Sequence, residues 1–145
     1  MSRHDFAGHH VLSEFMRPTP ATQVVVWLDA QVSGEVWVCA VTRAEIELGV
    51  AMMPDGQRKL GLQRAAEAMF AEEFAGRCLP FDGRAATCYA NIVAPRVRLG
   101  RPISVEDAQI AAIALAHGLA LATRNEGDFE LIEGISVVNP WQAVP

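Results

Sequence analysis

The sequence predicts an α/β domain built on a parallel sheet with helices on both faces, and two observations favour this fold class. Short apolar runs of strand length alternate along the chain with longer segments that have helical periodicity. Glycine and proline residues separate most of these segments, as they do at turns. The 145 residues, of which 51% are hydrophobic, are enough for one domain with a hydrophobic core.

The first half of the chain is expected to contain one strand and four helices. The strand, with the sequence VWVCAV, has the length and the β-branched content of a buried strand. Thr42 and Glu45 have the spacing of a capping box at the start of the helix that follows it. The segment Val24–Val26 also suits a strand. In chain order the predicted elements are a helix ended by Pro18 and Pro20, a helix, the strand and two helices, at 11–16, 21–31, 36–41, 42–52 and 58–74.

The second half is expected to contain three strands and two helices. Ser104 is a good N-cap for the second helix, which is apolar almost all round and should be buried, and Gly118 is placed to end it. Pro95 is expected to kink the first helix. The segment RNEGDF at 124–129 is predicted to be a polar loop. The other elements are a short strand or turn, the two helices and two strands, at 78–81, 83–98, 105–118, 119–123 and 135–139.

The charge of the chain limits its function. A net charge of −5 argues against a protein that binds nucleic acid by neutralising many phosphates, since such proteins are usually basic. It does not argue against a metal-dependent nuclease, because such a site is itself a cluster of carboxylates. Cys39, Cys78 and Cys88 match no zinc or redox spacing and are expected to be free thiols. Because we recognise no signal peptide or membrane span, we expect a cytoplasmic protein that does not bind membranes.

Acidic side chains occur where strands are expected to end or helices to begin. Glu45 follows the first strand, and Asp107 lies in the first turn of the apolar helix. Asn125 and Asp128 lie in the polar loop after the next strand. Parallel strands bring these ends to one edge of the sheet, where carboxylates repel one another unless a cation such as Mg²⁺ or Mn²⁺ neutralises them. Each acid also has a structural interpretation, as part of a capping box (Glu45), beside the Ser104 cap (Asp107) or as an ordinary loop acid (Asp128).

Read in order, several short segments resemble the PIN-domain toxins of bacterial toxin–antitoxin pairs, and the likeness is greatest to the VapC and FitB type. The resemblance extends from Val11 to Trp141. It implies a three-layer α/β/α fold with a central parallel sheet. No single segment is diagnostic, whereas the ordered set is specific. The segments are VLSEFMRP (11–18), AVTRAEIELGV (40–50), LPFD (79–82), ISVEDAQIAAIALAHGLALATRNEGDF (103–129) and VVNPW (137–141).

The resemblance also implies a chemistry and a set of partners. It implies a Mg²⁺- or Mn²⁺-dependent endoribonuclease that cleaves an RNA substrate. It implies a homodimer that a cognate antitoxin holds inactive, and contact with DNA only through that antitoxin. The alternative function is a catalytically impaired PIN domain that serves as an antitoxin-binding or regulatory module.

Residues are carried over from the family by position. Glu45 and Asp107 match acids of the family's metal site. A further acidic position falls in RNEGDF, where Asn125 stands in the place of an aspartate found in some members and Asp128 matches the acid of the other common arrangement. Which of these two serves is open. Thr42, Ser104 and Thr123 are candidates to orient ligands, and Arg43, Arg101 and Arg124 are candidates to admit an RNA backbone.

The N-terminal segment departs from the family pattern. The family's first strand ends in Asp-Thr-Asn, whose aspartate is a principal metal ligand, whereas Gly8, His9 and His10 occupy these positions here. A one-base deletion explains the difference. Loss of one A turns the codons GAC ACC AAC GTG, read from the preceding G, into GGA CAC CAC GTG for Gly-His-His-Val, and the shifted frame upstream reads Met-Ile-Leu-Leu. We therefore interpret residues 1–10 as an atypical segment, out of frame or disordered, and residues 11–145 as the PIN domain.

Two other interpretations of this segment stay open. His4, His9 and His10 could hold a transition metal, and DFAGHHVL could still pair as a poor strand. If the segment is disordered, the sheet lacks its central strand. The exposed edges of the neighbouring strands then predict weak stability or aggregation.

Overall fold

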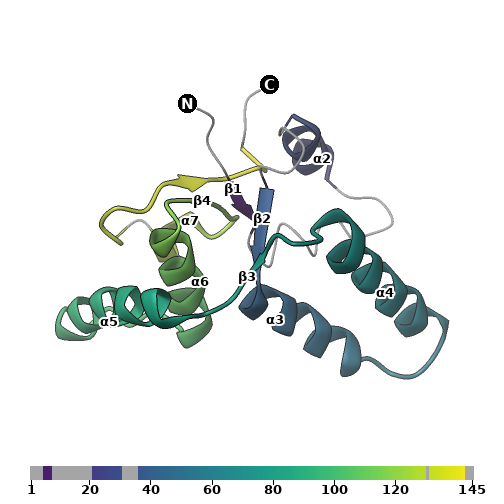
Figure 1. Cartoon of the computed structure of the whole chain (residues 1–145), viewed down its shortest axis with the longest axis horizontal. Helices are drawn as coiled ribbons and strands as arrows, with labels where there is room; N and C mark the ends of the chain where they lie inside the picture. Colours follow the sequence, from purple (N-terminus) through teal and green to yellow (C-terminus); the bar gives the residue numbers. More distant parts are fainter. Residues whose placement is uncertain (1–4, 8–20, 31–35, 130, 143–145) are drawn as a thin grey trace.

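A five-stranded parallel sheet lies at the centre of the structure, a computed structural model that describes residues 5–7, 21–30, 36–129 and 131–142. The strand order is β3-β2-β1-β4-β5, and each of the four pairings is parallel, as the sequence predicts (Figure 1). The central strand β1 pairs with β2 on one side and with β4 on the other. In chain order the strands are β1 (Asp5–Ala7), β2 (Val36–Cys39), β3 (Cys78–Leu79), β4 (Ala120–Ala122) and β5 (Val137–Val138).

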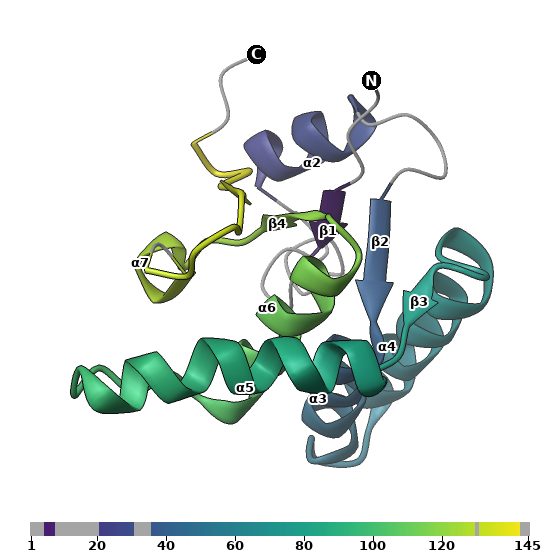
Figure 2. The same cartoon turned by 60° about the vertical axis from the view of Figure 1, so that its left-hand side comes forward.

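Helices cover both faces of this sheet. Helices α5 and α6 lie on one side and helices α3 and α4 on the other, and α5 crosses α6 (Figures 1 and 2). The arrangement confirms the predicted three-layer α/β/α fold class. The predicted helix at 11–16 lies outside the described residues. The helices are α2 (Thr22–Asp29), α3 (Ala40–Ala51), α4 (Gln57–Ala68), η1 (Met69–Glu73), α5 (Gly83–Arg98), α6 (Val105–Ala116) and α7 (Glu126–Phe129).

Alternate strand residues belong to two separate hydrophobic clusters. Cys39 and Leu121 pack with α5 and α6, whereas Val36, Val38 and Ala122 pack with α2, α3 and η1. Successive side chains of a strand point to opposite faces, so short strands that are apolar at every position serve both layers. This explains why the strands read as continuous apolar runs rather than as alternating ones.

Helix α6 is the most buried helix, as its composition predicts. Seven of its residues are buried, and Ile113 has no exposed surface. Ser104 caps its first turn and Gly118, at φ 64°, follows its last turn, which confirms both predicted boundaries. The small alanine side chains let α5 approach α6 closely, and these two helices make the most extensive helix contact in the described chain.

The predicted capping box at the start of α3 is wrong. The helix begins at Ala40, two residues earlier, and Cys39 is its N-cap, whose sulfur accepts a hydrogen bond from the Thr42 backbone N–H at 3.5 Å. Thr42 is fully buried, and its hydroxyl accepts a bond from the Cys39 thiol. Because β2 turns directly into α3, Glu45 lies in the second helical turn, where it has no capping role. The structural interpretation of Glu45 therefore does not hold.

Two other elements differ from the prediction. The helix predicted at 58–74 ends in the π-helical turn η1, where Met69, Phe70 and the adjoining Phe74 are all buried. The segment 124–129, predicted as a loop, contains the short helix α7. Phe129 is the only buried residue of α7, and it packs in the hydrophobic cluster that includes residues of α5 and α6. Because the residues around Phe129 are polar, the composition of the segment predicts a loop.

The N-terminal segment contributes a strand to the fold. Asp5 pairs with Val36 and Ala120, and Ala7 pairs with Ala122. Strand pairing is thus the arrangement found for residues 5–7, although a poor strand sequence occupies the centre of the sheet. The out-of-frame origin of residues 1–10 and the domain boundary at residue 11 stay predictions. In the described part of the chain, no helix is long and apolar enough to cross a membrane.

Candidate active site

The structure brings Glu45 and Asp107 together from two different helices. Burial raises the pKa of Glu45, and the nearby carboxylates of Asp107 and Glu106 raise this pKa further. Glu45 is half-buried on α3, which follows β2, and Asp107 is half-buried in the first turn of α6. The charges of these two predicted acids therefore interact in the folded chain, and their arrangement as a metal site stays a prediction.

Local bonds fix the backbone that carries Asp107. The Ser104 hydroxyl accepts a hydrogen bond from the Asp107 backbone N–H at 3.1 Å. The free N–H groups at this end of α6 favour negative charge, which offsets part of the repulsion between the acids. The cap explains why an aspartate is tolerated at this position. It does not explain why the aspartate lies beside the half-buried Glu45.

The segment that follows β4 carries the other predicted ligands. Thr123 is buried, and its hydroxyl accepts a hydrogen bond from the Asn125 backbone N–H at 3.2 Å. The side chains of Asn125 and Asp128 are exposed. Within the ranges that the structure describes, no group of three or more His, Cys, Asp or Glu residues is placed to hold a metal ion. Glu45 and Asp107 are thus two predicted site residues whose charges interact in the structure.

The donor set of this site suits a hard divalent cation. Mg²⁺ is commonly bound in proteins by one or two carboxylates, with water and substrate phosphate completing its shell. Glu45 and Asp107 are two such carboxylates from separate elements, and their mutual repulsion is relieved when a cation lies between them. The residues present therefore fit Mg²⁺ or Mn²⁺.

A polar network that the sequence did not reveal lies beside this segment. The buried Asn139 donates from Nδ2 to Glu126 Oε2 at 3.3 Å and accepts from the Trp141 backbone N–H at 3.0 Å. The guanidinium of Arg124 stacks on the Trp141 ring, 4.9 Å from its centroid. The segment NPW is visible in the sequence, but nothing in it shows that Asn139 reaches back thirteen residues to Glu126.

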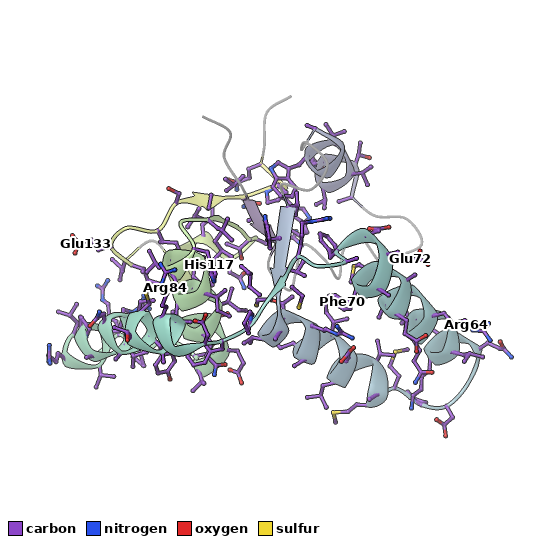
Figure 3. All side chains as sticks on the ribbon, viewed as in Figure 1. Arg64, Phe70, Glu72, Arg84, His117 and Glu133 are labelled. Carbon is purple, nitrogen blue, oxygen red and sulfur yellow. The ribbon has the colours of Figure 1, made fainter. Side chains whose placement is uncertain are left out.

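The three arginines expected near RNA differ in their surroundings. Arg43 bonds Glu47 at 3.0 Å and lies over the ring of Phe70, which belongs to η1 on the side of the molecule away from α6 (Figure 3). Arg124 directly precedes Asn125 and is held by Trp141. Arg101 is exposed in the loop before α6. Arg43 and Arg124 are both exposed and lie over aromatic rings, but Arg124 is the one that follows β4 and directly precedes Asn125.

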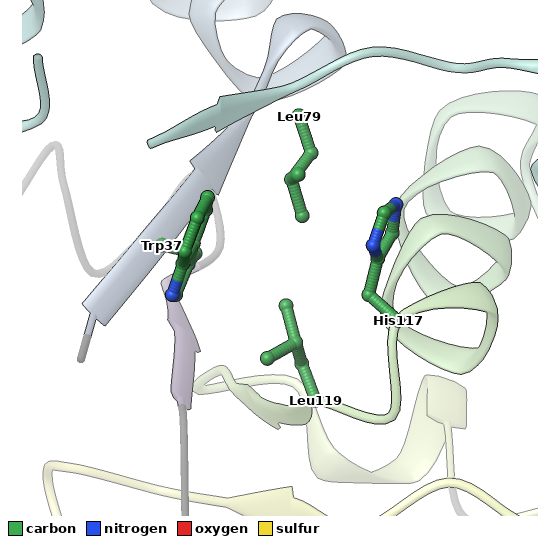
Figure 4. A pocket seen from close by; sticks show the side chains of 4 residues that line it. All are labelled: Trp37, Leu79, His117 and Leu119. Atoms are coloured by element: carbon green, nitrogen blue, oxygen red, sulfur yellow. The ribbon is translucent and has the colours of Figure 1, made fainter. Parts of the chain in front are cut away.

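A separate hollow of about 170 Å³ lies elsewhere on the molecule. Its lining consists of Trp37, Leu79, His117 and Leu119 (Figure 4). His117 follows the C-terminal end of α6, so the hollow lies at the opposite end of that helix from Asp107. The described residues of its lining include no carboxylate, so they add no acidic ligand to Glu45 and Asp107.

Comparison with known proteins agrees with this fold. The profile of the family described as PIN domain matches residues 10–134. The chain is 41% identical to Toxin FitB of Neisseria gonorrhoeae over 132 residues, which cover 91% of this chain and 94% of that protein. It is 38% identical over 133 residues to a VapC ribonuclease of Sinorhizobium fredii, covering 92% and 94% of the two chains.

A solved structure is similar along almost the whole chain. The structure of FitAB bound to an IR36 DNA fragment superposes with a TM-score of 0.88 at 38% sequence identity. The match covers 97% of this chain and 97% of the other. The similarity therefore includes the elements that carry Glu45, Asp107 and the segment after β4.

Proposed function

Since the chain belongs to the PIN-domain family and is close to the VapC and FitB toxins, we propose that it is a metal-dependent endoribonuclease toxin of a toxin–antitoxin pair. The observation that carries the proposal is the pairing of Glu45 with Asp107. Burial and the nearby charge of Asp107 disfavour ionisation of Glu45, and a cation that binds oxygen would offset this cost. A surface carboxylate without a function would not require a cation beside it.

The residues have distinct roles in this proposal. Asp107 and Glu45 supply oxygen ligands, and Asn125 or Asp128 supplies a further one. Mg²⁺ or Mn²⁺ held by these residues would supply Lewis-acid chemistry, polarising water and offsetting the negative charge that develops at the scissile phosphate. The buried Thr123 holds the backbone of Asn125 in place.

Binding of RNA by an acidic protein needs a local cation. The net charge of −5 repels an RNA backbone at long range, so contact depends on single basic side chains near the site. We assign this contact to Arg124, whose guanidinium is oriented by Trp141. Arg43 is a weaker candidate because its charge is paired with the Glu47 carboxylate at 3.0 Å.

The partners in this proposal are a cognate antitoxin and a second copy of the chain. Two similar solved structures are complexes of a related toxin with a partner protein, and one of these two complexes is bound to DNA. We propose that this chain forms a homodimer, that its antitoxin covers the acidic site, and that DNA is contacted only through the antitoxin. The free cysteines fit a reducing cytoplasm.

A second function is favoured by one observation. Gly8 stands where the resemblance places the first metal-binding aspartate. Loss of one ligand of a hard-cation site weakens both metal binding and catalysis. The chain would then be a catalytically impaired PIN domain that still binds its antitoxin and regulates through that complex.

A ribonuclease assay with Mg²⁺ or Mn²⁺ tests the proposed function. Asp107→Asn and Glu45→Gln are each expected to lower the rate about 100-fold or more, because each removes a ligand from a site that supplies several kcal/mol of transition-state stabilisation. The matched control is Glu133→Gln, an equivalent change at an exposed acid away from the site (Figure 3). Full activity in Asp107→Asn, or activity that survives a chelator, would contradict the proposal.

A further inference from the structure

We infer that Arg96 is a positioning residue for the acidic site, because it ties the segment after β4 to the loop that leads into α6. The inference rests on the proposed function, since it concerns the placement of that function's ligands. Arg96 lies in the last turn of α5 and is only 8% exposed. It is one of the few buried polar residues in the described chain, and the only arginine among them.

The guanidinium of Arg96 joins two backbone carbonyls from different elements. Its Nε donates to the carbonyl of Arg101 at 2.7 Å, and its Nη1 donates to the carbonyl of Asp128 at 3.3 Å. It forms no ion pair with any described residue. Its partners among the described residues are these two carbonyls, and the two bonds hold the segments that carry the carbonyls in a fixed relation to the buried guanidinium.

Each of the two carbonyls lies close in the chain to candidate ligands. Arg101 precedes by three residues the N-cap Ser104, which holds the backbone of Asp107. Asp128 lies in α7, three residues after Asn125, so both candidates for the further ligand belong to this segment. One guanidinium therefore sets the separation between the chain that leads to Asp107 and the chain that carries Asn125 and Asp128.

The shape of the arginine side chain matters for this role. A guanidinium donates along fixed directions in one plane, so two bonds to two carbonyls define both a distance and an orientation. A lysine ammonium is a compact point donor that keeps the charge without the planar fork. Arg96→Lys therefore keeps the positive charge but removes the planar arrangement of donors, so the two contributions can be measured separately.

Arg84 offers a matched control on the same helix. Its Nη2 donates to the carbonyl of Ala116 at 2.7 Å, so it also ties α5 to a backbone carbonyl. This contact lies at the C-terminal end of α6, beside His117 and away from Asp107 (Figure 3). Arg84→Gln removes the same kind of bond without touching the acidic site.

The experiment compares Arg96→Gln, Arg96→Lys and Arg84→Gln in the full chain. Hydrogen exchange of the backbone amides at 125–129 reports order in the segment, and titration with Mn²⁺ alone reports affinity. Thermal unfolding curves of all variants are used to choose an assay temperature at which every variant is folded. We expect Arg96→Gln to speed exchange at 125–129 and to weaken Mn²⁺ binding about tenfold or more, as loss of partners that orient ligands does. Arg96→Lys should recover thermal stability more fully than Mn²⁺ affinity, and Arg84→Gln should change neither exchange at 125–129 nor affinity.

Two results would overturn the inference. One is unchanged exchange at 125–129 in Arg96→Gln. The other is an equal loss of Mn²⁺ affinity in Arg84→Gln, which would show a general effect of stability. If the unaltered chain binds no Mn²⁺, the proposed function fails instead, and the exchange comparison alone then decides whether Arg96 orders this segment.

Discussion

At the scale of single residues, Glu45 is in an environment that disfavours its own negative charge. Its pKa is raised by burial and by the charges of Asp107 and Glu106, so the metal-free fold disfavours its ionised form. A divalent cation between the two acids reverses this preference, because it favours the ionised form of each. In the metal-free chain, ionisation of Glu45 at higher pH therefore destabilises the fold, whereas binding of a divalent cation favours the ionised side chain.

Glu45→Gln is expected to raise the melting temperature of the chelator-treated chain at pH 8. The raised pKa means that folding penalises ionised Glu45, so this penalty grows as pH rises through the folded-state pKa and is absent below the ordinary glutamate pKa. The gain from Glu45→Gln should therefore shrink toward zero as the pH is lowered to about 4. Thermal unfolding at both pH values measures this gain in melting temperature, with Glu133→Gln as the control. An equal loss of stability at both pH values would contradict this account.

At the scale of elements, the sequence predicts what depends on local pattern and misses what depends on distant contacts. Strand β2 and helix α6 were predictable because apolar runs and a cap are local signals. Helix α7 was not predictable from local pattern, because this helix depends on the burial of Phe129. The pairing of Glu45 with Asp107 followed from the rule for parallel strand ends. The role of Arg96 could not be predicted, since its partner Asp128 is 32 residues away.

Asn139→Asp is expected to destabilise the chain by about 1–3 kcal/mol at neutral pH. The variant keeps an acceptor for the Trp141 backbone N–H, but it removes the donor to Glu126 and places two carboxylates side by side. Urea unfolding measures the loss. The double variant Glu126→Gln with Asn139→Asp exchanges amide and carboxylate and should recover most of it, because the glutamine amide can donate. No recovery in the double variant would exclude this hydrogen bond as the cause.

At the scale of the whole molecule, we predict that the N-terminal segment affects both the stability of the sheet and the binding of a metal. Strand β1 lies between β2 and β4, so its residues join the two halves of the sheet. The sequence at these positions, Asp-Phe-Ala, is a poor choice for a central strand. Gly8, the next residue in the sequence, has no side chain to offer a metal.

The shifted reading frame that we predict would supply both an apolar strand and an aspartate. Counted back from Val11, Met-Ile-Leu-Leu-Asp-Thr-Asn corresponds to the changes Asp5→Ile, Phe6→Leu and Ala7→Leu in β1, followed by Gly8→Asp. The three apolar residues thus coincide with the three positions of the strand. The aspartate coincides with the position directly after it, where the resemblance to the family places the first ligand.

Replacement of residues 1–10 by these seven residues is expected to raise the free energy of unfolding by about 2 kcal/mol or more. It should also raise Mn²⁺-dependent ribonuclease activity about 100-fold or more, because a missing ligand is restored. Gly8→Asp alone separates the two effects, since it adds the ligand without changing β1. Each chain is assayed beside its own Asp107→Asn control. Equal Asp107-dependent activity in the unaltered and replaced chains would show that position 8 needs no carboxylate, and that the N-terminal segment does not impair the proposed activity.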